Sequence, residues 1–114
     1  MRLIFDLFPC QTDSRLRGIG RYTLSLAKAM ASSAGAHEMR LLANGLYPAT
    51  TSQLRREFAG LVAPGAFASY THTPLPAHDS GNVQLQQVAS ALVHAAYQSL
   101  GADALLCASP FEGW

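Results

Sequence analysis

The residues best suited to chemistry lie in one short polar run, Ser14 to Thr23, which reads SRLRGIGRYT. Its two glycines, Gly18 and Gly20, would let a ligand approach the backbone closely because no Cβ atom stands in the way. The run opens a helical pattern, and the first turn of a helix offers unpaired N–H groups and partial positive charge to an anion. The run therefore predicts a site for a phosphorylated or sugar-nucleotide ligand.

Three arginines in the same run strengthen its preference for an anion, because each side chain is permanently charged and rich in hydrogen-bond donors. The predicted binding residues of the run are Arg15, Arg17, Gly18, Ile19, Gly20 and Arg21. The run is no dinucleotide fingerprint, since Thr23 stands at the position of the third glycine, and it lacks the Gly-Lys-Ser/Thr of a Walker loop. A purely structural role stays open, in which the glycines make a tight connection and the arginines pair with Asp6 or Asp13.

Two acidic residues lie near the ends of predicted strands. Asp6 stands in an apolar segment, where a buried carboxylate needs partners, so we expect it to accept from loop N–H groups or to pair with Arg15 or Arg17. Glu112 follows the last strand segment, on the side of the sheet where open α/β folds bind ligands. It is either an acceptor for sugar hydroxyls or a solvated loop acid. The four histidines are expected to be structural or loop residues (His37, His72, His78 and His94).

Composition narrows the classes of function. The chain has 114 residues, 49% of them hydrophobic and 13% charged, and residues 1–114 are expected to form one domain. Its net charge of +1 is too small to attract nucleic acid by overall electrostatics. Cys10 and Cys107 are isolated and show no metal-ligand spacing; we expect reduced thiols, with a disulfide as the less favoured alternative. Without a membrane-spanning run or a signal peptide, the protein is expected in the cytoplasm.

Apolar segments alternate with helical patterns along the chain, which is typical of an α/β fold with a parallel sheet. The expected strands are Arg2 to Phe8, Glu38 to Ala43, Ala66 to Tyr70 and Ala104 to Ala108, and the expected helices Gly20 to Ser33, Thr51 to Gly60 and Val83 to Leu100. Right-handed crossovers predict a Rossmann-like, doubly wound sheet in the order 3-2-1-4.

The spacing of apolar residues also predicts which side of each helix is buried. The expected buried stripes are Ile19, Tyr22, Leu26, Ala29 and Met30 in the first helix, Leu54, Phe58 and Leu61 in the second, and Leu85, Val88, Ala89, Leu92 and Ala96 in the third. The fourth strand segment is followed by no helix that would cover it, so we expect a truncated piece of a longer protein that self-associates through this strand edge. Light scattering on a concentrated sample would contradict this by showing a monomer.

Three stretches together resemble a known family: Arg2 to Leu7, Arg15 to Ala27 and Ser109 to Trp114. They are similar to the N-terminal domain of GT-B, group 1 retaining glycosyltransferases, above all bacterial mannosyltransferases that build surface polysaccharide such as lipopolysaccharide. The resemblance places Gly18, Ile19 and Gly20 near the donor diphosphate and the transferred sugar. Where many relatives carry a histidine after the fourth strand, this chain has Ser109-Pro110, which leaves the catalytic residues unknown.

The resemblance implies transfer of a hexose, with mannose as one option, from a GDP- or UDP-linked nucleotide sugar to a growing polysaccharide or lipid-linked glycan. It implies no cofactor and no metal, and a cytoplasmic position that extends to the inner face of the plasma membrane. The donor-binding C-terminal domain would follow Trp114, so this chain alone is expected to show no turnover in a sugar-transfer assay. The alternative is a non-catalytic α/β module that binds a ligand or a partner.

Overall fold

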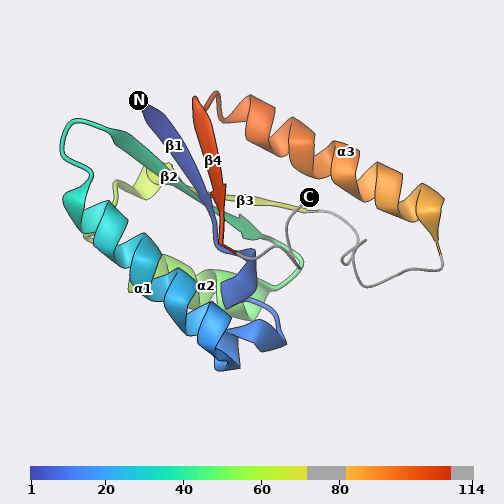
Figure 1. The fold of residues 1–114 in the computed structure, drawn as a ribbon, viewed down its shortest axis with the longest axis horizontal. Helices are drawn as coiled ribbons and strands as arrows, with labels where there is room; N and C mark the ends of the chain where they lie inside the picture. The colour runs from blue at the N-terminus through green and yellow to red at the C-terminus, as the bar shows by residue number, and fades with distance from the viewer. Residues whose placement is uncertain (72–81, 109–114) are drawn as a thin grey trace.

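The computed structural model describes residues 1–71 and 82–108, and in them four parallel strands form one sheet in the order β3-β2-β1-β4 (Figure 1). The strands are β1 (Arg2–Asp6), β2 (Glu38–Asn44), β3 (Phe67–Tyr70) and β4 (Ala104–Cys107). Each neighbouring pair is parallel. The structure confirms the predicted α/β class, the Rossmann-like topology and the strand order.

Helices cover both faces of the sheet. Helices α1 (Gly18–Ser33) and α2 (Pro48–Glu57) lie on one face, and α3 (Val83–Ser99) lies on the other (Figure 1). Because side chains alternate along a strand, neighbouring residues of β1 enter different cores: Phe5 packs on the α1 and α2 side, and Ile4 packs on the α3 side. In the part of the chain that is described, no helix has the length and apolarity to cross a membrane.

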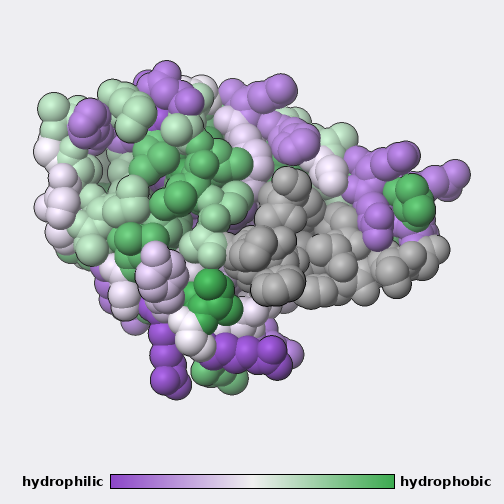
Figure 2. All heavy atoms as spheres, viewed as in Figure 1, coloured by the Kyte–Doolittle hydropathy of each residue, from purple (hydrophilic) through white to green (hydrophobic). Residues whose placement is uncertain are grey.

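The buried stripes of the helices differ in part from the predicted ones. Both α1 and α3 pack through small residues, which bring a helix close to the sheet: Thr23 and Ala27 in α1, Ala89 and Val93 in α3. Three larger apolar residues of the predicted stripes are instead turned outward, Tyr22 (58% exposed), Val88 (55%) and Leu92 (46%). The prediction is also wrong at Ala29, which is exposed. Figure 2 shows both hydrophilic and hydrophobic residues on the visible surface of α3.

The stripe predicted for the second helix is largely right. Leu54 and Phe58 are buried in the core between α2 and the sheet. The predicted burial of Leu61 is wrong, because α2 ends at Glu57 and the turn that follows leaves this leucine exposed.

The connection between β1 and α1 contains two helical turns that were not predicted from the sequence. The first strand ends at Asp6 rather than Phe8, and two short 3-10 helices follow, η1 (Phe8–Cys10) and η2 (Asp13–Leu16). The hydroxyl of Thr12 caps η2 by accepting from the backbone N–H of Ser14 at 3.2 Å. The polar run at the start of α1 is therefore presented by folded turns and not by an open loop.

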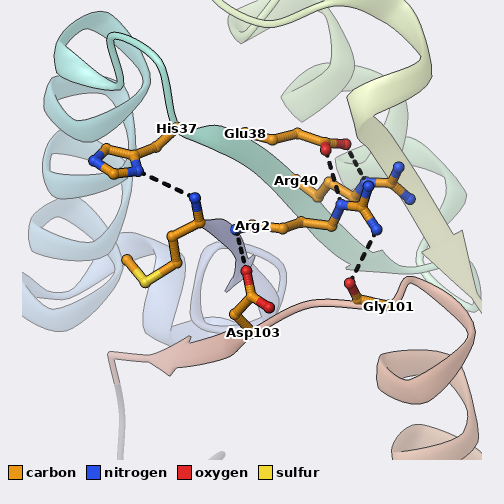
Figure 3. A network of polar contacts seen from close by, with 7 residues as sticks. Arg2, His37, Glu38, Arg40, Gly101 and Asp103 are labelled. Carbon is orange, nitrogen blue, oxygen red and sulfur yellow. Dashed lines mark hydrogen bonds and ion pairs between the residues drawn. The ribbon is translucent and has the colours of Figure 1, made fainter.

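An ion-pair network closes the amino edge of the sheet (Figure 3). Glu38 of β2 accepts from Arg2 Nε at 2.8 Å and from Arg40 Nε at 2.7 Å, and these arginines lower the pKa of its carboxyl. Arg2 also donates through Nη1 to the carbonyl of Gly101 at 3.0 Å, while its backbone N–H donates to Asp103 at 2.7 Å. These contacts join β1, β2 and the α3–β4 turn at the edge opposite to the strands' carboxyl ends.

Candidate functional site

The topology marks one position on the carboxyl edge of the sheet. Helix α1 leaves β1 on one face, whereas α3 enters β4 from the other face (Figure 1). In open α/β sheets ligands bind outside the carboxyl ends of the strands at such a switch point. Asp6 and Cys107 are the last register pair of β1 and β4 and therefore lie at this position.

The Asp6 carboxylate is buried at the switch point, with only 2% of the residue exposed. Its Oδ1 accepts from the backbone N–H of Phe8 at 2.9 Å, which confirms the predicted capping of the connection after β1. Its Oδ2 accepts from the hydroxyl of Tyr97 in α3 at 2.7 Å. The structure thus gives Asp6 a tyrosine partner where the sequence predicted Arg15 or Arg17.

The groups around Asp6 are held in their neutral forms. Burial, and then the negative charge of Asp6, raise the pKa of Tyr97 well above its usual range. Although Cys107 is exposed as a residue, partial burial of its thiol and then the charge of Asp6 raise its pKa to about 11, and hydrogen bonding with Tyr97 opposes this rise. Cys10 and Cys107 are both free thiols, the first buried and the second exposed, as predicted for reduced cysteines.

The raised pKa predicts how Cys107 reacts. Although this residue is exposed, we expect iodoacetamide to modify it slowly near neutral pH, because the thiolate is the nucleophile and the thiol dominates below the pKa. The rate should rise about tenfold per pH unit and level off near the raised pKa of about 11. Mass spectrometry of the modified chain over a pH series measures this profile. A plateau at the ordinary thiol pKa of about 8.5 would contradict it, and Asp6→Asn should move the profile to lower pH.

The predicted arginines are close in the chain: Arg15 lies in η2, Arg17 between η2 and α1, and Arg21 in the first turn of α1. Arg15, Arg17 and Arg21 are exposed. Arg15 Nη1 lies 3.4 Å from the backbone oxygens of Gln11 and Thr12. Arg17 is the N-cap residue of α1 and makes no side-chain capping bond. Three exposed arginines therefore stand at or near the start of α1, and the N-cap residue makes no side-chain capping bond there.

The two glycines of the run have different surroundings. A Cβ atom on Gly18 would meet nothing within 4 Å, and this residue is exposed. A Cβ atom on Gly20 would lie 2.2 Å from the Ser14 carbonyl oxygen and 2.5 Å from Arg15 Cα. The absent side chain of Gly20 therefore allows η2 to pack on α1. The half-buried Ile19 stands between them, and contact of these residues with a ligand stays a prediction.

Sequence reasoning missed Gln11. This residue lies between η1 and η2 with 1% of its surface exposed, and its side chain reaches the carboxyl end of β2. Its Oε1 accepts from Asn44 N at 2.7 Å, and its Nε2 donates to Asn44 O at 3.0 Å and to Thr51 Oγ1 at 2.9 Å. A glutamine in a polar stretch gives no periodic signal, so only the structure identifies this contact.

Glu112, His72 and His78 fall outside the described residues. In residues 1–71 and 82–108 no group of three histidine, cysteine or acidic residues is placed to hold a metal. An open hollow of about 470 Å³ lies on α2, lined by Gln53, Arg56 and Glu57, and includes none of the predicted binding residues.

Comparison with known proteins gives one partial match. No model of a known protein family matches the chain, and no solved structure matches it. Over 48 residues, 42% of this chain, the sequence is 40% identical to the serotype-specific mannosyltransferase WbdA of Escherichia coli. That match covers 6% of the length of WbdA. The chain is thus similar to a short part of a glycosyltransferase.

Proposed function

We propose that the chain is the acceptor-side portion of a GT-B glycosyltransferase that moves a hexose, with mannose preferred, from a GDP- or UDP-linked donor to a growing glycan. The observation that carries this proposal is the 40% identity to part of a mannosyltransferase. The parallel sheet in the order β3-β2-β1-β4 supports it, because such sheets bind ligands at their carboxyl edge.

The polar run at the start of α1 suits the proposed donor. Transfer of a sugar leaves negative charge on the departing diphosphate, and donors already in place stabilise that charge best. The exposed guanidinium groups of Arg15, Arg17 and Arg21 and the helix start at Gly18 supply such donors. The catalytic residues and the donor-binding domain would lie outside this chain.

Binding of the donor can be tested on the chain itself. We expect GDP-mannose or UDP-glucose to shift the amide NMR signals of Gly18 and Ile19 saturably, because these N–H groups lie at the start of α1. Arg17→Ala should weaken the binding about tenfold, as expected for loss of one charged hydrogen bond.

The control for this test is Arg56→Ala, which removes the same charge from an exposed position on α2. It should leave the affinity unchanged. Equal weakening by both variants would show an attraction that depends on net charge alone. A chain that binds neither nucleotide sugar would overturn the proposed contact between the polar run and the donor.

A further inference from the structure

We propose that Gln11 is a positioning residue, which fixes η2 and thereby the places of Arg15 and Arg17 beside the start of α1. The inference rests on the proposed function for the ligand, a diphosphate, but its structural half can be measured without one. Among the described residues, the side chain of Gln11 bonds to Asn44, Thr50 and Thr51 and to none of the predicted binding residues, so it acts through the segment that follows it.

The side-chain amide of Gln11 satisfies both backbone groups of the last residue of β2. It accepts from the N–H of Asn44 and donates to the carbonyl of the same residue. Its second N–H points to Thr51 Oγ1 at 2.9 Å, and that hydroxyl in turn donates to Asn44 O at 3.0 Å. Gln11 and Asn44 are both buried, so these bonds form away from water, where a missing partner is costly.

Backbone hydrogen bonds between residues close in the sequence connect Gln11 to the arginines. The N–H of Arg15 donates to Thr12 O, and the N–H of Arg17 donates to Ser14 O, both at 3.0 Å. The guanidinium of Arg15 also returns toward the backbone oxygen of Gln11 at 3.4 Å. Hydrogen bonds therefore constrain the segment from the buried amide of Gln11 to the exposed Arg15 and Arg17.

The far end of this segment is held as well. Ser14 and Arg15 pack where the side chain of residue 20 would otherwise stand, so η2 rests directly on α1. The segment is thus fixed at Gln11 on the β2 side and at Gly20 on the α1 side. Loss of the Gln11 contact should release it from one side only.

The test is Gln11→Glu in the full 114-residue chain. The new carboxylate keeps an acceptor for Asn44 N but loses the donor, and it places negative charge against Asn44 O. We expect amide hydrogen exchange to accelerate at Arg15 and Arg17 while the sheet stays protected. We also expect the affinity for inorganic pyrophosphate to fall about tenfold, which corresponds to about 1.4 kcal/mol.

The matched control is Gln98→Glu, which adds the same charge at an exposed position in α3. It should change neither the exchange of η2 nor the affinity. Should Gln11→Glu unfold the whole chain, Thr51→Val removes one acceptor of the Gln11 amide, and acceleration confined to residues 12–17 then supports the inference.

The outcomes separate this inference from the proposed function. If the unmodified chain binds no pyrophosphate, the proposed function fails, and hydrogen exchange alone then decides whether Gln11 positions η2. If the unmodified chain binds and Gln11→Glu changes neither exchange at residues 12–17 nor affinity, the positioning role is wrong. Faster exchange with unchanged affinity would reduce Gln11 to a structural residue and overturn the inference.

Discussion

Replacing Gly20 with alanine is expected to lower the free energy of unfolding by about 1–3 kcal/mol, the usual cost of forcing a methyl group into a packed site. The added Cβ would stand 2.2 Å from the Ser14 carbonyl oxygen and 2.5 Å from Arg15 Cα. Both are backbone atoms, which cannot swing aside as the tip of a side chain can. Relief therefore requires η2 to move away from α1, and Arg15 moves with it.

The matched control is Gly18→Ala, two residues earlier in the same helix. Nothing lies within 4 Å of the position that its Cβ would occupy. Alanine favours a helix interior over glycine by about 1 kcal/mol, and less at an end, so this variant should be neutral or slightly stabilising. Urea denaturation of both variants measures the difference. Equal stability of the two would show that η2 does not rest on α1 as described.

The order of the fold followed from the sequence because its signals are local and repeated. Apolar segments such as Leu3 to Phe5 mark strands buried on both faces, and the helical patterns between the segments require parallel crossovers. Which residues of α1 and α3 face the sheet was harder to predict from the sequence. Periodicity favours the largest apolar residues as the buried ones. In α1, close packing on the sheet instead buries the small residues Thr23 and Ala27, whereas the predicted Ala89 of α3 is buried as expected.

The candidate site was predictable only where its residues are adjacent in the chain. The run from Arg15 to Arg21 is contiguous, so its charges and glycines could be read together. The contact between Asp6 and Tyr97 joins residues 91 positions apart, and Gln11 reaches Asn44 across 33 positions. A carboxylate in an apolar strand needs a hydrogen-bond partner, but which side chain becomes that partner depends on how α3 crosses the sheet.

The Tyr97→Phe variant is the sharpest test of that crossing. The phenol donates to a carboxylate that is 2% exposed, and loss of a hydrogen bond to a charged group costs about 1.5–3 kcal/mol. Phenylalanine keeps the ring in the core between α3 and the sheet, so the loss isolates the hydroxyl. We expect the free energy of unfolding to fall by this amount near neutral pH.

The response to pH has a definite sign. The pKa of Tyr97 is raised in the folded chain by burial and by Asp6, so the folded state holds this proton longer than the unfolded state does. The hydroxyl's contribution to stability is therefore complete below the ordinary tyrosine pKa of about 10 and declines as the pH rises above it. Urea titrations at neutral and alkaline pH should show a larger gap between the unmodified chain and Tyr97→Phe at neutral pH.

Tyr22→Phe supplies the control, because that phenol stands on a residue 58% exposed in α1. Removing its hydroxyl should leave the stability unchanged, as most exposed substitutions do. Hydrogen exchange adds the location: Tyr97→Phe should speed exchange in α3 ahead of α1, since the lost bond is one that ties α3 to β1. If the two tyrosine variants lost equal free energy of unfolding, or if exchange accelerated equally in both helices, the bond between Tyr97 and Asp6 would not be what holds α3 to the sheet.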